Sequence, residues 1–385
     1  MTTQRKKVLF AGSLSASQAN ALGVQMLHLA EPFGSAWTNC YWYDDGKGPS
    51  DAPSAFPLYT RLPFLWPLTK GRGFVTRTIA RFGIGWWQGS HIIERKKPRL
   101  RKLFEDVGFA YVAPFTNVDA TRCREILQTL GCPFVVHIWD FLDAPLNGDY
   151  EWLFSHAKHV FYLSPTMIKE IRTSVASDMS LLAFSRRKSQ HQAKHRGDNV
   201  LKIGLIGTLS TYQEGPKLLG QAVERLRDNF AEVRLRYIGS DRELQFIPQE
   251  LRPLTECSGF LDDDGRDRVL AECDVAFLPG PALAPEMDAR SRHSVPSRSA
   301  DYLAVGLPVI AAVHPSSATN AFFSSIQGKG FFPASEPEDI GLAAQRLRNE
   351  VFWKNASESS LRFFDGNLDM EQVQKQLFAV AEPFL

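Results

Sequence analysis

The stretch "SVPSRSADYLAVGLPVIAAV" (294–313) predicts a short helix that stops sharply before a buried strand. Gly306 fits the position just after a helix, and Pro308 keeps the helix from resuming. The apolar run 309–313 is typical of a strand in a parallel sheet that is covered on both faces. Because ligands of open α/β sheets bind at strand ends and helix N-termini, Arg298 and Asp301 on this helix are candidate binding residues.

Two segments share one layout of strand, loop and amphipathic helix. The first runs through "VLFA" (8–11), "GSLSASQAN" and "ALGVQMLHLAEPF", and the second through 200–207, "TLSTYQEG" and "PKLLGQAVERLRDNF". In the second helix, Pro216 takes a favourable first position. Each segment predicts the opening unit of a Rossmann-like half. The polar stretch 185–199 between them predicts a linker.

Further strands alternate with helical patterns in both halves. We predict these strands at 109–115, 133–141, 159–165, 233–240, 257–261, 274–280 and 307–313. The alternation predicts an α/β protein with two facing Rossmann-like domains. We expect an N-terminal domain over 1–190, a C-terminal domain over 200–355, and a helical segment over 356–385. Packing of this last segment back on the first domain is one alternative for its position.

Bulk composition narrows the class of protein. A chain of 385 residues is too long for one core, and 44% hydrophobic with 22% charged residues is typical of a globular protein. The formal net charge of +2 does not indicate a nucleic-acid partner. The five cysteines form no C-x-x-C pair, which favours a reducing compartment over a disulfide framework or a zinc site.

The N-terminus, "MTTQRKKVLFAGSLSASQANALG", places basic residues before apolar ones. Its apolar part, 8–11, is too short for a secretory signal, so we interpret it as the first strand, with a signal peptide as the second alternative. No run approaches the roughly 18 apolar residues of a membrane span. We therefore expect a cytoplasmic protein.

An ordered series of motifs resembles a known family. "IGLIGTLSTYQEGPKLLGQAVERL", "YIGS", "SGFLDDDGRDRVLAECDVAFLPG" and "VPSRSADYLAVGLPVIA" follow one another within 200–345. The series resembles the donor-binding domain of GT-B glycosyltransferases, in particular the family-4-like group that uses nucleotide sugars. The first half is matched by its layout and by "HIWDF" followed by "YLSPTMIKEI".

The resemblance implies a phosphate site in the second half. Gly207 and Thr208 begin the loop whose backbone N–H groups would face the donor diphosphate. Arg298 stands where the family has a phosphate-binding Lys, and its guanidinium can meet a phosphate bidentately.

The same resemblance implies contacts to the nucleoside. Asp301 takes the place of the Glu that accepts hydrogen bonds from the ribose hydroxyls, and it is one methylene shorter. The backbone around Gly259 and Phe260 would contact the base.

The sequence departs from the family at two positions. A second Glu, which holds the donor sugar in many relatives, is His293 here. The Lys after the glycine loop is Glu214, with Lys217 three residues on. The donor sugar and the stereochemical outcome therefore stay open, and the long stretch 279–298 indicates a rebuilt loop over the donor site.

Each of these residues has a structural alternative. Asp301 could pair with Arg298 at (i, i+3) on a helix surface. Gly207 could serve a tight turn that any Rossmann-like domain needs, and His293 could be a solvated histidine in a polar loop.

In the first half, His137 and Asp140 end a predicted buried strand, where they could orient or deprotonate an acceptor hydroxyl. The alternative is that His137 is a satisfied core histidine and Asp140 caps a helix. The pairs His156/His159 and His191/His195 have helical spacing without a third ligand, so we predict no metal site.

A basic, aromatic stretch covers 61–104, where Glu94 is the one acid. Cationic residues attract anionic headgroups by about 1 kcal/mol each, and Trp settles at the membrane interface. We expect Arg81, Trp86 and Trp87 to face a membrane, on an interfacial helix over 73–87. The alternative is a core of aromatics with a solvated charged rim. A nucleic-acid partner is not expected, because no recognised module accompanies the stretch.

Together these features predict transfer of a sugar from a nucleotide sugar to an acceptor hydroxyl. We expect the acceptor to be a saccharide or a lipid-linked saccharide. A lipid-linked acceptor would place the reaction in cell-surface polysaccharide synthesis, at the inner face of the cell membrane. Loop amides and Arg298 would stabilise the leaving diphosphate, so we expect no metal and no cofactor besides the nucleotide sugar. The alternatives are a non-catalytic GT-B binding protein and a nucleotide-sugar epimerase. A nicotinamide dehydrogenase is disfavoured, since neither first loop carries G-x-G-x-x-G.

Overall fold

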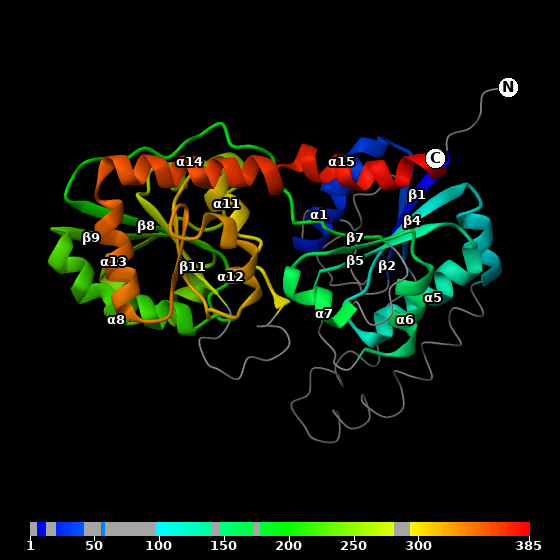
Figure 1. The fold of residues 1–385 in the computed structure, drawn as a ribbon, viewed down its shortest axis with the longest axis horizontal. Helices are drawn as coiled ribbons and strands as arrows, with labels where there is room; N and C mark the ends of the chain where they lie inside the picture. The colour runs from blue at the N-terminus through cyan, green and yellow to red at the C-terminus, as the bar shows by residue number, and fades with distance from the viewer. Residues whose placement is uncertain are drawn as a thin grey trace, which may run out of the picture. The chain divides into compact units, whose positions relative to one another are not determined.

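The computed structural model describes residues 6–12, 21–41, 55–57, 97–139, 146–171, 178–280 and 293–385. The chain divides into two compact units (Figure 1). The first consists of Met1–Tyr162, Lys169–Leu182 and Gln374–Leu385, and the second of Leu163–Ile168 and Ala183–Val373. The stretch expected to be a linker, 185–199, lies within the second unit, and the expected C-terminal segment 356–385 is divided between the two.

The first unit is built on a parallel sheet with the order β3-β2-β1-β4-β5-β6-β7. Its central strands are buried along almost their whole length, as the apolar sequence predicts for a sheet covered on both faces. The strands are β1 (Lys7–Gly12), β2 (Trp37–Tyr41), β3 (Ala55–Pro57), β4 (Val107–Ala113), β5 (Phe134–Ile138), β6 (His159–Tyr162) and β7 (Asp178–Leu181).

Helices of the first unit connect these strands. α5 and α6 lie side by side (Figure 1), and α5 begins with a capping box between Thr116 and Asp119. α7 and α15 each cross a boundary between the residue ranges of the two units. The helical elements are α1 (Ala21–Ala30), η1 (Glu31–Phe33), α5 (Asn117–Leu130), α6 (Gly148–His156), α7 (Ile168–Ile171), α15 (Met370–Ala381) and η7 (Glu382–Phe384).

The second unit repeats this order over six strands, as β10-β9-β8-β11-β12-β13. All its strand pairs are parallel, with Ile203 of β8 beside Leu235 of β9 and Val275 of β11. The repeated order confirms the predicted α/β class with two Rossmann-like units. The strands are β8 (Val200–Ile206), β9 (Glu232–Ile238), β10 (Thr255–Cys257), β11 (Val275–Pro279), β12 (Val309–Ala312) and β13 (Phe331–Ala334).

Helices α8 and α13 pack side by side in the second unit (Figure 1). α8 begins at Glu214, two residues before the predicted start at Pro216. The other helical elements are η3 (Pro165–Met167), η4 (Asp241–Phe246), η5 (Arg252–Leu254), α9 (Asp263–Ala271), α11 (Ser299–Ala304), α12 (Ala318–Phe322), η6 (Ser324–Ile326), α13 (Pro337–Leu347) and α14 (Glu350–Asn367).

The end of α11 follows the sequence prediction. Gly306 has φ +76°, and the backbone N–H of Leu307 reaches back to the carbonyl of Tyr302 at 3.0 Å. A left-handed glycine just after the helix satisfies the last helical carbonyls. β12 follows at Val309, and every residue of that strand is buried. The predicted helix stop and buried strand are therefore confirmed.

The predicted strand at 257–261 is largely wrong, because β10 ends at Cys257. Gly259 has φ +69°, and its carbonyl accepts a hydrogen bond from the N–H of Gly239. That positive φ turns the chain out of the sheet.

Within the described part of the chain, no helix has the length and apolar character needed to cross a membrane.

Candidate functional site

The candidate site lies at the carboxyl end of β8, where the glycine loop begins. Gly207 has φ +87°, and a Cβ added there would lie 3.5 Å from Cζ of Arg298. The hydroxyl of Tyr237, at the end of β9, donates to the carbonyl of Gly207 at 2.8 Å. The positive φ therefore favours glycine here, whereas an added Cβ would make only an ordinary contact with the arginine.

Arg298 stands immediately before α11 and spans the start of the loop. Its Nη1 donates to the carbonyl of Ile206 at 2.7 Å, and Nη2 donates to the carbonyl of Thr208 at 3.2 Å. The guanidinium also lies over the ring of Tyr212, 5.4 Å from its centroid. A guanidinium has five N–H donors, so two of them fix its orientation while others stay available for an anion. None of the described carboxylates is within ion-pair distance of Arg298.

Tyr302 fixes α11 to the strands below it. Its hydroxyl accepts from the backbone N–H of Ile206 at 2.9 Å and donates to the carbonyl of Phe277 at 3.2 Å. Burial raises the pKa of Tyr302, which keeps the hydroxyl protonated and able to donate. The helix that carries Asp301 is thus tied to both β8 and β11.

The loop amides already bind a carboxylate. The backbone N–H groups of Leu209 and Ser210 donate to Oε2 of Glu243 at 2.7 and 2.8 Å, and the hydroxyl of Ser210 donates to Oε1 at 3.3 Å. Such a nest of amides favours a negative charge. Glu243, which lies in η4 beyond β9, was not among the residues predicted from the sequence. The one feature of the sequence that could have indicated Glu243 is its position after β9. β9 neighbours β8, so the carboxyl ends of the two strands lie at the same edge of the sheet.

Gly259 and Phe260, which the resemblance assigns to the base, lie beyond β10 at the same edge of the sheet. Phe260 is 84% exposed, the most exposed of the large apolar side chains among the described residues. An aromatic face left in solvent can stack on a planar ring.

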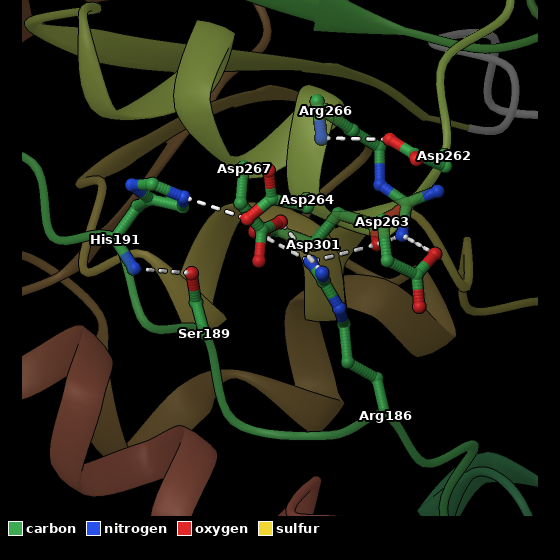
Figure 2. Close-up of polar contacts among 10 residues, drawn as sticks. Arg186, Ser189, His191, Asp262, Asp263, Asp264, Arg266, Asp267 and Asp301 are labelled. Atoms are coloured by element: carbon green, nitrogen blue, oxygen red, sulfur yellow. Dashed lines mark hydrogen bonds and ion pairs between the residues drawn. The ribbon is translucent and has the colours of Figure 1, made fainter.

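Asp301 lies in a cluster of ion pairs rather than beside Arg298 (Figure 2). Its Oδ1 is 3.0 Å from Nη1 of Arg186 and 3.0 Å from Nη2 of Arg266. The alternative (i, i+3) pair with Arg298 is therefore wrong. Burial raises the pKa of Asp301, and the charges of Arg266 and Arg186 oppose that rise.

His293 is 3% exposed, so the alternative of a solvated histidine is wrong. Its Nδ1 is 3.1 Å from the hydroxyl oxygen of Thr166 in η3. The neighbouring Ser294 accepts from the hydroxyl of Thr319 through its carbonyl at 3.1 Å. A buried, hydrogen-bonded imidazole thus occupies the position where the resemblance expects a carboxylate.

The other departure from the family forms a surface pair. Nζ of Lys217 lies 2.7 Å from Oε1 of Glu214, and both side chains are more than half exposed. Lys217 therefore neutralises Glu214 on the first turn of α8. Arg298 is left as the cation nearest the glycine loop among the residues described above.

In the first unit, His137 is a buried core histidine, which was the structural alternative. The chain of hydrogen bonds around it has one direction. The carbonyl of Leu182 can only accept, so Nε2–H donates to it at 2.9 Å and Nδ1 accepts from the Tyr111 hydroxyl at 2.6 Å. The Tyr111 oxygen in turn accepts from Nε1–H of Trp139 at 3.0 Å.

Burial lowers the pKa of His137 to about 3. Both of its ring nitrogens are occupied, and the side chain has no exposed surface. This placement gives no support to the expected contact with an acceptor. Asp140, the other expected catalytic residue, lies outside the described residues, as do Arg81, Trp86, Trp87 and positions 281–292 of the predicted loop 279–298.

The paired histidines make separate contacts. His159 bonds the hydroxyl of Ser180, His191 lies 2.9 Å from Asp264, and His195 reaches the carbonyl of Arg348. Across the described ranges, no group of three His, Cys, Asp or Glu side chains has a geometry that could hold a metal ion.

The fold is similar to those of several solved enzymes. Anabaena HepE in complex with UDP superposes with a TM-score of 0.68 at 12% identity, covering 98% of this chain and 100% of that one. Sucrose-phosphate synthase from Thermosynechococcus elongatus gives 0.68 at 13% identity, covering 98% and 99%. The lipopolysaccharide outer core galactosyltransferase WaaB gives 0.64 at 11%, covering 98% and 100%. The sequence matches no protein-family model and no curated protein. At these identities the likeness shows the fold, which is that of GT-B glycosyltransferases.

Proposed function

We propose that this protein is a glycosyltransferase that moves a sugar from a nucleotide sugar to an acceptor hydroxyl. The observation that carries the proposal is Arg298, held by two backbone carbonyls against the glycine loop at the carboxyl end of β8. Solved proteins with the same fold bind UDP or UDP-glucose, as the HepE complexes do. A cation fixed at this edge of a Rossmann-like sheet suits a nucleoside diphosphate.

The chemistry needs negative charge to be stabilised as the sugar leaves. When the bond between the anomeric carbon and the diphosphate breaks, charge accumulates on the terminal phosphate oxygens. Arg298 would donate to those oxygens from N–H groups that the loop carbonyls do not use. Because its position is fixed before the reaction, little reorganisation is needed as the charge develops.

The nucleoside would extend along the strand ends. In this proposal, the base contacts Gly259 and stacks on the exposed ring of Phe260. The ribose hydroxyls lie near Asp301, three residues after the phosphate-binding arginine on α11. His293 replaces a carboxylate near the donor sugar, so this part of the site would recognise the sugar through an imidazole.

The acceptor side belongs to the first unit in this proposal. A lipid-linked saccharide would suit a protein that docks at the inner face of a membrane through Arg81, Trp86 and Trp87. The helical turn over 97–103 adds exposed Arg99, Arg101, Lys102 and Leu103. This part of the proposal is tested by sedimentation with vesicles of anionic or zwitterionic phospholipid. Binding that is equally weak to both would contradict it.

The donor site is tested by calorimetric titration of the purified protein with UDP, GDP, ADP and CMP. We expect one nucleoside diphosphate to bind, and Arg298→Ala to weaken it at least about tenfold, since a charge-assisted hydrogen bond contributes about 1.5–3 kcal/mol. Lys217→Met is the matched control, because it removes a cation of the same βα unit that pairs with Glu214.

The outcomes separate the possible functions. Release of sugar from the nucleotide sugar that binds, increased by an acceptor, supports a transferase. Interconversion of the sugar without an acceptor would indicate an epimerase, and binding without turnover would indicate a binding protein. If the folded wild type binds none of the four nucleotides, the proposal fails.

A further inference from the structure

Arg186 lies where the chain enters the second unit, and its side chain points between two helices of that unit (Figure 2). Its Nη2 is 2.6 Å from Oδ1 of Asp267 on α9, and its Nη1 is 3.0 Å from Oδ1 of Asp301 on α11. The arginine side chain is 8% exposed. One buried cation therefore connects α9, α11 and the entering segment.

The backbone of Arg186 is as firmly placed as its side chain. Its N–H donates to the carbonyl of Leu368 at 3.1 Å, and its carbonyl accepts from the N–H of Met370 at 3.0 Å. These bonds hold the entering segment against the chain that follows α14. The guanidinium is consequently presented to Asp301 from a fixed point.

Both arginines lie nearest to the same oxygen of Asp301. Oδ1 receives both Arg186 and Arg266, each at 3.0 Å. Nη1 of Arg186 also donates to the backbone carbonyl of Asp301 at 3.5 Å, and the Asp301 side chain keeps 17% of its surface exposed. A carboxylate that is held through one oxygen has a restricted rotamer. The lone pairs of its other oxygen can then accept hydrogen bonds from hydroxyl groups.

The charges of the two arginines oppose the rise in the pKa of Asp301 that burial causes. Asp301 is poorly hydrated, and a carboxylate in such a place ionises readily only beside cations. Each arginine is also paired with a second carboxylate, Arg266 with Asp263 at 2.7 Å and Arg186 with Asp267 at 2.6 Å, and Arg186 is the more buried of the two. Both arginines therefore constrain Asp301 from the same distance.

We infer that Arg186 is a positioning residue for nucleotide binding: by gripping Oδ1 of Asp301, it aims Oδ2 at the ribose hydroxyls of the donor. The inference rests on the proposed function. Arg186 itself touches no part of the nucleotide. Its effect on affinity should therefore depend on the hydroxyls that Asp301 would bind.

This dependence defines the experiment. The probes are the nucleoside diphosphate that the wild type binds best among UDP, GDP and ADP, and the 2′,3′-dideoxy form of the same nucleotide. The wild type should bind the normal nucleotide about tenfold or more tightly than the dideoxy form, as expected for a hydrogen bond to a charged group.

In Arg186→Met, affinity for the normal nucleotide should fall by about that same factor, while affinity for the dideoxy form should stay within about twofold. Arg186→Lys should recover part of the difference, because an ammonium can reach one carboxylate without the planar fork. Lys188→Met is the matched control from the same segment. It breaks an exposed pair with Asp365 and should leave both affinities unchanged.

Arg266→Met removes the other arginine that contacts Asp301. It is the replacement variant if circular dichroism shows that Arg186→Met does not fold. It should reduce the preference for the normal nucleotide in the same way. Equal losses for both nucleotides would overturn the inference and leave the proposed function standing. If the wild type binds none of the three diphosphates, the proposed function falls and the inference falls with it.

Discussion

Both backbone polar groups of Ile206 are bound by side chains from around α11, its carbonyl by Arg298 at 2.7 Å and its N–H by Tyr302 at 2.9 Å. β11 pairs with β8 through Ile203 and Gly204, so the strands have separated by the time the chain reaches Ile206. The helix therefore supplies the partners that a neighbouring strand would otherwise supply. This arrangement places a cation at the strand end as part of the hydrogen bonding of the fold.

Glu243→Gln should destabilise the second unit by about 1–3 kcal/mol, because the amides of Leu209 and Ser210 lose a charged acceptor. It should also weaken nucleotide binding, since the loop is then held less firmly. Urea denaturation and calorimetry measure the two effects. Glu224→Gln is the control, because it removes an exposed pair with Arg227 and should cost less than about 0.5 kcal/mol. Equal effects of both substitutions would contradict the assigned role of Glu243.

Gly306→Ala should destabilise the protein by about 1–2 kcal/mol. The residue has φ +76°, and a Cβ there would lie 3.0 Å from Oγ of Ser357 on α14. Gly366→Ala is the opposite case, because Gly366 lies in α14 and a Cβ would meet nothing within 4 Å. That change should stabilise the helix by about 0.5–1 kcal/mol. Thermal unfolding compares the two, and destabilisation of the same size by both would refute the argument.

Asp274 should make stability fall as pH rises from about 4 to 6. Burial raises the pKa of this carboxyl to about 6, and the hydrogen bond from the backbone N–H of Lys202, which stabilises the charged form, opposes that rise. The unfolded chain ionises first, so the folded state loses its advantage as pH rises through the folded pKa. Between pH 4 and 7, the free energy of unfolding of Asp274→Asn should therefore rise by about 2 kcal/mol relative to that of the wild type. Urea titrations at both pH values test this, and a constant difference between the proteins would contradict it.

Tyr111→Phe should destabilise the first unit by about 2–4 kcal/mol, because it leaves Nδ1 of His137 and Nε1–H of Trp139 buried without their partner. Nucleotide affinity should not change in the folded variant, since the donor site belongs to the second unit. Chemical denaturation and calorimetry give the two readings. A loss of affinity without a loss of stability would argue that this network takes part in binding.

Local patterns in the sequence predicted the elements well. The stop of α11 at Gly306 and the buried strand after it were predicted, because a left-handed glycine, a proline and an apolar run each act within a few residues. The repeated sheet order also follows from two similar strand–loop–helix openings. The strand predicted over 257–261 failed at Gly259, where a positive φ turns the chain.

The partners of the site residues could not be predicted in the same way. Arg186 precedes Asp267 by 81 positions and Asp301 by 115, and it lies in a polar stretch that reads as a linker. Glu243 is 34 positions from Leu209. Such contacts depend on how helices and loops pack at one edge of the sheet. Residue spacing carries information about one element at a time, so it does not specify them.

The last helix has a consequence for how the chain matures. Phe378 stacks on Phe33 with ring centroids 5.8 Å apart, and Phe384 stacks on Phe109 at 5.5 Å. The segment Gln374–Leu385 thus completes the hydrophobic packing of the unit that the ribosome makes first. That unit leaves the exit tunnel with uncovered aromatic rings, and it has to keep them from aggregating until translation of the second unit has finished.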